Sequence, residues 1–475
     1  MDNSLIVNIL KSLSKEEIKD FGRFAGSPYF VNRKKVYELF EILKDFYPDF
    51  PQEAMEKGDI YKKLFPGAEY DDVVLRKAAS YLHKALKEYL AYRNFKNNEF
   101  LYDNCLLEEA YKRGLDKLAL SSVNSMEKLL NENSMQSEEA YYNRYKLEEQ
   151  KHILSSGKNS ERDWQKTFDS YCTYFLFNLL RHYSVMSNDM KFYKIEYRLH
   201  FRDEVLSMLE GSMFLKVPSI AIYFYTIKLF YSPENEDYFY KLKELLFKNG
   251  GELDKVAEEG IYIYLQNYCY RRSDAGEARF LKERFDILKK MIGKKLCLRQ
   301  GYMIKDFFNS MVIVSLELGE VSYAENFIKK YRSFLQPAQD SSILNFNYAC
   351  LEFYKKNYES ALEYLSKVEY DDFYDKVIVR SMNLMIYYEA GMIEQGLSLI
   401  DSFNHFLSSN KDVSPYVKKR TKNFINLVNR LFKLKEANTK TDPVKLKKDI
   451  YESDMLMRRM WLIEKISELE TIKEK

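Results

Sequence analysis

The sequence has few of the residues that interrupt helices. Of its 475 residues, only 16 are glycine and 9 are proline. No proline occurs between Pro66 and Pro218. A fold made of many short strands would need frequent turn residues across such an interval. Their scarcity argues against a mainly β fold and favours helices.

Cysteine is also scarce, and its spacing matches no ligand or disulfide motif. The count of five is odd, the spacings are wide and unequal, and no CxxC element occurs. This usage fits reduced thiols that pack as small apolar residues in a cytosolic protein. The N-terminal stretch starts acidic rather than basic and has no cleavage-like site, so we do not expect a signal peptide. The predicted location is the cytoplasm.

Neither charge nor hydropathy selects a partner for the whole chain. The 74 basic and 71 acidic residues nearly cancel, so no overall field favours nucleic acid or an anionic membrane. The most apolar interval, residues 217–231, is interrupted by Lys228. It is shorter than the ~18–20 residues that a membrane-spanning helix needs. We therefore expect no membrane insertion.

The motifs of common catalytic and cofactor sites are missing as well. The sequence has no GxxxxGK[ST], GxGxxG, GxSxG or HExxH element, and its five histidines lie far apart without Cys/His pairing. Metal and nucleotide sites depend on such spacings. We expect no enzymatic activity, no cofactor and no metal site.

What the sequence does contain is a helical hairpin between Phe346 and Val368. Small residues, Ala349 and Ala361 among them, stand where two helix backbones must approach, and large apolar residues follow at helical spacing. Asn357 stands at the turn, where we expect a residue that tolerates left-handed dihedral angles. The pattern predicts two antiparallel helices.

The same pattern recurs on both sides of this hairpin. Gly319 precedes an apolar stripe that starts at Ala324, and Gly391 precedes one that starts at Gly396. The turn residues 319, 357 and 391 lie 38 and 34 residues apart, close to the ~34-residue period of tetratricopeptide repeats. Residues 304–404 resemble three degenerate repeats of that family.

This resemblance implies an all-α fold, an α-solenoid of tetratricopeptide-like hairpins with an N-terminal helical domain and C-terminal capping helices. In the last segment, Asp442 and Pro443 are expected to start one long helix that carries Met457 and Trp461. We divide the chain into an N-terminal helical domain (1–96), a degenerate helical-repeat region (97–303), tetratricopeptide-like repeats (304–410) and basic helices that cap the stack (411–475).

The N-terminal segment has two further resemblances. A capping box of Ser14 and Glu17 predicts a helix start. The FAGSPYF and LFPG sequences resemble the N-terminal region of a group of bacterial helical-repeat proteins that has no assigned function. The helix after LFPG is also similar to part of the winged-helix domains of some bacterial transcriptional activators. That second resemblance implies a DNA-recognition helix with Arg76, Lys77, His83, Lys84 and Lys87.

In the tetratricopeptide family, the first helix of each pair lines a concave surface that binds peptides or protein segments. Carried onto this sequence, the resemblance implies a peptide-binding groove formed by Asn309, Ile313, Asn347, Leu351, Tyr354, Ser381, Met385 and Tyr388. Asparagine side chains at such positions would hold an extended peptide backbone. The leading functional prediction is a non-enzymatic scaffold or adaptor that binds a peptide or protein segment.

A basic segment near the end supports an alternative function. Positions 411–450 hold 12 basic and 4 acidic residues. A cluster of such charges on one helix face would attract an acidic partner or a phosphate backbone, whereas dispersed lysines would only hydrate the capping helices. The alternative is a nucleic-acid-binding regulator with a winged-helix-like N-terminal domain and a helical-repeat sensor or oligomerisation region. The candidate patch consists of Lys418, Lys419, Arg420 and Lys422.

Overall fold

The chain folds into two compact units made almost entirely of α-helices. The computed structural model describes residues 4–132, 135–155, 164–193, 195–337, 340–369, 372–410, 415–436, 442–453 and 455–473. Unit 1 comprises residues 1–134 and 139–172, and unit 2 comprises residues 135–138 and 173–475. The all-α prediction is confirmed.

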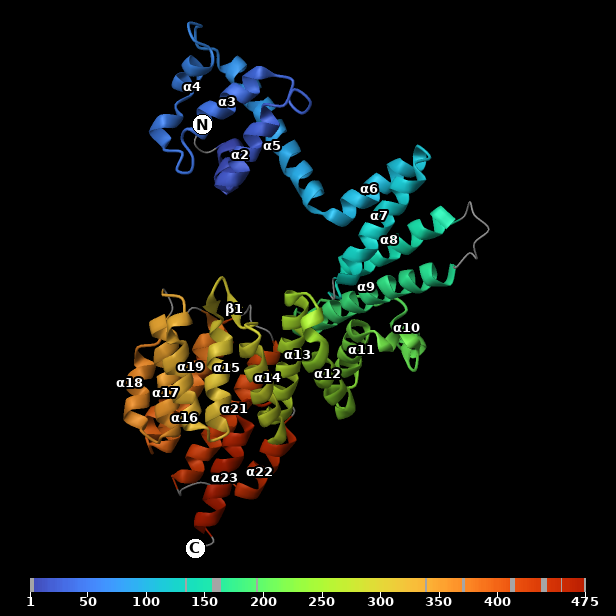
Figure 1. Ribbon diagram of the computed structural model, residues 1–475. Helices are drawn as coiled ribbons and strands as arrows, with labels where there is room; N and C mark the ends of the chain where they lie inside the picture. The colour runs from blue at the N-terminus through green and yellow to red at the C-terminus, as the bar shows by residue number, and fades with distance from the viewer. Residues whose placement is uncertain are drawn as a thin grey trace. The chain divides into compact units, whose positions relative to one another are not determined.

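Unit 1 contains the first eight helices, and helix α9 contributes residues to both units (Figure 1). The elements are α1 (Leu5–Ser12), α2 (Lys15–Ala25), α3 (Lys34–Lys44), the 3-10 turn η1 (Gln52–Met55), α4 (Lys57–Leu64), α5 (Asp72–Asn97), α6 (Glu99–Lys112), α7 (Asp116–Glu132), α8 (Glu138–Ser155) and α9 (Trp164–Tyr193).

The buried side chains of unit 1 form two clusters. One gathers the apolar faces of α1 to α5, and the other gathers those of α6 to α8. The predicted capping box is present, since Ser14 Oγ accepts from the Glu17 amide and the Glu17 carboxylate accepts from the Ser14 amide. Residues 4–132 contain no strand. The predicted recognition helix is part of α5, where Arg76 pairs with Asp72.

Unit 2 contains the remaining helices and one short antiparallel strand pair, in which Leu298 pairs with Met303. The elements are α10 (Arg202–Leu209), η2 (Met213–Lys216), α11 (Pro218–Tyr231), α12 (Glu236–Asn249), η3 (Gly250–Glu252), α13 (Lys255–Asp274), α14 (Arg279–Gly293), β1 (Leu298–Arg299), β2 (Tyr302–Met303), α15 (Lys305–Glu317), α16 (Val321–Tyr331), η4 (Arg332–Phe334), α17 (Asp340–Tyr354), α18 (Tyr358–Ser366), α19 (Phe373–Glu389), α20 (Ile393–Ser409), α21 (Pro415–Lys435), α22 (Pro443–Glu452) and α23 (Arg459–Lys473).

From α11 to α21, each helix packs against the next helix in the chain. We call α13, α15, α17 and α19 the first helices and α14, α16, α18 and α20 the second helices. First helix α15 also packs against first helix α17. Ala324 and Ala361, predicted to let helix backbones approach, are both fully buried in the second helices α16 and α18. Small residues therefore bring consecutive helices together here.

The turn between α17 and α18 differs from the prediction by one residue. The left-handed residue is Lys356 (φ 63°), and Asn357 (φ −90°) is instead the N-cap of α18. Lys356 thus corresponds to Gly319 (φ 79°) and Gly391 (φ 72°) in the neighbouring turns. The amide side chain of Asn357 donates to Glu352 (2.7 Å), which fixes it at the helix start rather than in the left-handed position.

The single long C-terminal helix of the prediction is wrong, because the chain forms two helices there. α22 ends at Glu452 and α23 begins at Arg459. Arg458 adopts a left-handed conformation (φ 56°) just before α23. The guanidinium of Arg459 donates to the carbonyl groups of Ile450, Tyr451 and Ser453. These bonds satisfy the free carbonyls at the end of α22 and so terminate it.

The close packing of α20 on α21 gives a first testable prediction. A β-carbon added at Gly396 would lie 2.3 Å from Phe432 Cζ, and Phe432 is fully buried. Gly396→Ala should therefore lower the free energy of unfolding by about 1–3 kcal/mol through overpacking. Gly260 is a matched control, since an added β-carbon there meets nothing within 4 Å inside α13. Gly260→Ala should be neutral or stabilising by up to ~1 kcal/mol. Equal denaturation midpoints for the two variants would contradict this packing.

Candidate functional site

The eight predicted groove residues lie on three consecutive first helices. Asn309 and Ile313 belong to α15, the next three to α17, and the last three to α19. Most of them are covered by other parts of the chain. The half-buried residues are Asn309, Ile313 and Tyr354, and the buried ones are Asn347, Leu351, Ser381, Met385 and Tyr388.

A small recess opens near the N-terminal ends of α15, α17 and α19. Its volume is about 40 Å³. Lys305 Nζ pairs with Asp375 Oδ2 (2.6 Å) on its wall, and Asn309 also lines it. The side-chain amide of the buried Asn347 donates to Asn309 Oδ1 (2.6 Å) and to the Ile343 carbonyl (2.7 Å). Asn347 Oδ1 has no hydrogen-bond partner. The predicted asparagines thus contact each other beside this recess.

The predicted groove residues on α19 lie against residues 455–465, which we call the C-terminal segment. Ser381 Oγ lies 3.8 Å from Met457 Sδ. The ring of Tyr388 meets the ring of Trp461 edge-on, with centroids 5.5 Å apart. The residues that cover this end of the first helices are therefore the chain's own, and the motif analysis did not predict that contact.

The C-terminal ends of the four first helices share a further feature. Their last residues are Asp274, Glu317, Tyr354 and Glu389, and we call these four residues the acceptor row. In each case the residue two positions later is left-handed (276, 319, 356 and 391). The sequence therefore contains a signal for this row, namely an acidic or phenolic residue two positions before each turn residue.

The acceptor row is occupied by donors from α21 and from the C-terminal segment. Arg420 in α21 pairs with Asp274, and Arg458 Nη1 pairs with Glu317 Oε1 (3.2 Å). Glu389 Oε1 accepts from Trp461 Nε1 (2.9 Å) and pairs with Lys465 Nζ (2.8 Å). In Figure 1, α22 and α23 lie at one end of the helices of unit 2 and β1 lies at the other. The row therefore contacts a segment far away in the sequence.

Helix polarity explains why cations gather at this end. The C-terminus of a helix carries a partial negative charge, which favours Arg and Lys within the last turn. Burial raises the pKa of Asp274 above its ordinary value, although Arg420 opposes the shift. Burial alone would lower the pKa of Lys465, but hydrogen bonds to Glu389, Glu464 and Glu468 raise it. Lys465 is thus held in its charged form.

Arg284, in α14, is a buried cation whose hydrogen bonds in the described part of the chain go to neutral side chains. The guanidinium of the buried Arg284 donates to Gln266 Oε1 and to Ser310 Oγ, both at 3.1 Å. Burial lowers the pKa of Arg284, with the nearby charge of Glu317 opposing the shift. The charge of Glu317 therefore offsets part of the cost of burying this cation.

Arg420, one of the four residues of the predicted basic patch, is not presented at the surface. Arg420 turns inward, where its guanidinium donates to Asp274 and to Tyr270 Oη. Lys419 and Lys422 remain exposed, and Lys418 is half-buried. Arg420 therefore joins α21 to α13 instead of presenting a charge to an anionic partner.

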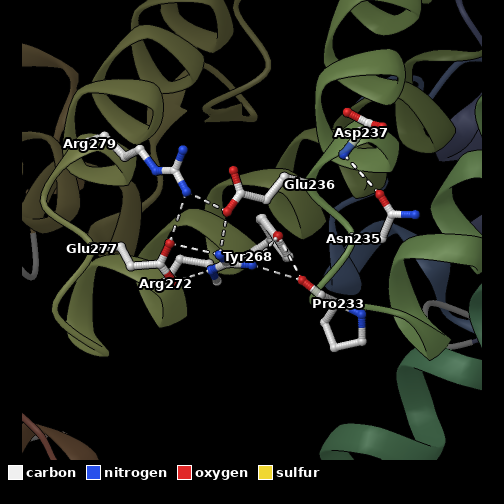
Figure 2. Close-up of polar contacts among 8 residues, drawn as sticks. All are labelled: Pro233, Asn235, Glu236, Asp237, Tyr268, Arg272, Glu277 and Arg279. Atoms are coloured by element: carbon white, nitrogen blue, oxygen red, sulfur yellow. Dashed lines mark hydrogen bonds and ion pairs between the residues drawn. The ribbon is translucent and has the colours of Figure 1, made fainter. Parts of the chain in front are cut away.

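A second polar cluster joins α12 to the end of α13. Figure 2 shows Arg272 between the carboxylates of Glu236 (2.6 Å) and Glu277. Its guanidinium also donates to Tyr268 Oη (2.9 Å). Arg279 pairs with the same two carboxylates. The hydrogen bond to Glu277 raises the pKa of Arg272. Two arginines and two carboxylates balance, so this cluster holds helices together.

Neither a metal-binding cluster nor a membrane-spanning helix is present within the described ranges. No group of three or more His, Cys, Asp or Glu side chains there is arranged to hold a metal ion. Among the described helices, none combines the length and the apolar character needed to cross a membrane.

Comparison of the chain with family models, with curated proteins and with solved structures gave no significant match.

Proposed function

We propose that this chain is a non-enzymatic scaffold or adaptor whose helical array binds a segment of another protein on its first helices. In this proposal, unit 2 is an α-solenoid of degenerate tetratricopeptide-like pairs. The sequential packing from α11 to α21 and the small residues between the helices support that description. A cytoplasmic location suits the buried thiols of Cys269, Cys297 and Cys350.

One observation carries the proposal. The first helices already hold a peptide segment, since residues 455–465 of the chain contact Asp274, Glu317 and Glu389. The anchoring groups are arginine and tryptophan, which dominate the energetics of many protein interfaces. A surface that binds one such segment of the chain has the chemistry to bind a similar segment of a partner.

Affinity capture with the full-length chain tests this function. Partners should be retained after nuclease treatment, because the contacts are with protein. Asn309→Ala should reduce capture about fivefold, a loss typical of an interface residue that contributes ~1 kcal/mol. Asn345→Ala is the matched control, since Asn345 lies on α17 and donates to the Lys367 carbonyl beyond the end of second helix α18.

Two results would overturn the proposal. Partners that disappear after nuclease treatment would favour the nucleic-acid-binding alternative, and binding that falls steeply as salt rises would agree with it. Equal capture by Asn309→Ala and Asn345→Ala, together with no effect of Glu317→Gln at the other end of the same helices, would remove the first helices as the binding surface.

A further inference from the structure

The acceptor row has a regular chemistry. At three of its four positions, a carboxylate stands at the C-terminal end of a first helix, and the fourth position is the phenol of Tyr354. Each carboxylate adds a full charge to the partial negative charge of its helix end. Helix ends alone are common, but here Arg458 and Lys465 pair with two of the three carboxylates, Glu317 and Glu389, and Arg420 of α21 pairs with the third. That occupancy indicates what the row recognises.

We propose that the acceptor row is a binding site for basic, aromatic protein segments. In this proposal, residues 455–465 are its intramolecular ligand, and a partner segment of the same chemistry replaces them. The partner segment carries two adjacent arginines, an aromatic residue two positions later and a lysine four positions after that. This inference rests on the proposed function and specifies its partner.

Residues 458–465 reach the C-terminal ends of three of the four first helices. Arg459 Nε donates to the Asp274 carbonyl (3.0 Å), at the end of α13. Arg458 pairs with Glu317, at the end of α15. Trp461 and Lys465 both reach Glu389, at the end of α19. Positions 461 and 465 lie one helical turn apart and so share a face of α23.

The contacts to the acceptor row come from far away in the sequence. α23 packs against its neighbours α21 and α22, and residues 458–465 in addition contact acceptors 72 to 185 positions earlier. The contacts to the row are ion pairs and hydrogen bonds around one aromatic anchor, Trp461, as in many interface hot spots.

The same arrangement discriminates against acidic segments. A carboxylate in place of Arg458 would face Glu317, and one in place of Lys465 would face Glu389. Like charges at such distances are repelled, and the helix C-termini add to the repulsion. The row is therefore selective for the sign of charge on its ligand.

The tethered segment competes with any free segment for the acceptor row, and this competition determines the affinity that an experiment measures. A tethered segment acts at an effective concentration in the millimolar range, so a free segment binds weakly while the row is occupied. Weakening the tethered segment releases the row. The apparent affinity for a free segment then rises in proportion to the fraction of molecules in which the tethered segment has left the row.

Fluorescence anisotropy with a labelled synthetic peptide of residues 453–469 tests the proposal in the full-length chain. The combined Arg458→Gln and Lys465→Gln variant weakens the tethered segment and leaves the row intact. It should bind the peptide at least tenfold tighter than the wild type. Met460→Ala is the matched control, because Met460 lies in the same segment with 43% of its surface exposed. It should bind like the wild type.

Changes in the row then identify the binding site. Adding Glu317→Gln to the weakened variant should reduce peptide affinity at least fivefold, whereas Glu320→Gln, an exposed carboxylate three residues later, should not. A peptide with glutamine in place of both arginines and the lysine should also lose affinity. Equal binding of the two peptides, or no effect of Glu317→Gln, would overturn the proposal.

Two outcomes separate this inference from the function on which it rests. If the weakened variant loses helicity, the wild type at high peptide concentration supplies the binding curve, and a lack of saturable binding there would refute the proposal. If no form of the chain binds the peptide but partner capture still depends on Asn309, the scaffold function stands and the predicted partner chemistry is wrong.

Discussion

Replacing Arg459 with alanine is expected to lower the free energy of unfolding of unit 2 by about 3–5 kcal/mol, because several hydrogen bonds from a charged donor are lost together. Arg459 is only 5% exposed. Its guanidinium donates to four carbonyl groups, at the ends of α22 and α13. Alanine leaves the buried Ile450 carbonyl and three half-buried carbonyls without this donor, at up to ~1–3 kcal/mol each before relaxation.

Chemical denaturation followed by the fluorescence of Trp461 measures this loss, and amide exchange in α22 locates it. Lys448→Ala removes an exposed pair with Glu452 (3.7 Å) from the same helix and should cost less than about 0.5 kcal/mol. An Arg459→Ala variant as stable as Lys448→Ala would show that Arg459 does not join these helices.

Trp461→Ala should cost a similar amount, about 3–5 kcal/mol, the range for removing a large aromatic side chain from a core. The indole is 8% exposed and packs edge-on against Tyr388. A second ring, Phe424, lies 6.4 Å away between centroids. Alanine also removes the hydrogen bond to Glu389. Thermal and chemical denaturation measure the effect.

The only other tryptophan of the chain is its natural control. Trp164, in unit 1, is 60% exposed, and its ring lies tilted against that of His152 (3.8 Å between centroids). Trp164→Ala should change stability by less than ~1 kcal/mol, as surface substitutions usually do. Equal destabilisation by the two substitutions would mean that Trp461 is not an anchor of the C-terminal segment.

The sequence predicted local structure well because local rules decide it. Helical spacing placed the hairpin of α17 and α18, and the small residue Ala361 is fully buried. A side-chain oxygen at Ser14 and the Asp442–Pro443 pair both start helices as expected. In each case the determining residues lie within one or two turns of one another.

Longer-range features were missed because no neighbouring residue specifies them. The break between α22 and α23 depends on Arg459, which also reaches the α13 carbonyl 185 residues earlier. Arg420 looked like a surface cation but pairs with Asp274, 146 residues away. The positions of the groove residues on first helices followed from the resemblance to tetratricopeptide repeats. The contacts of residues 455–465 with the C-terminal ends of these helices were not predicted.

The most direct test of the central claim is whether a free segment displaces the tethered one. In the full-length Trp164→Phe variant, Trp461 is the only tryptophan. Its emission is followed while a peptide of residues 453–469, with Phe in place of Trp461, is added up to ~1 mM, the range of a tethered segment's effective concentration. We predict a saturable red shift with increased acrylamide quenching. Unchanged emission and quenching over that range would contradict an exchangeable ligand on the acceptor row.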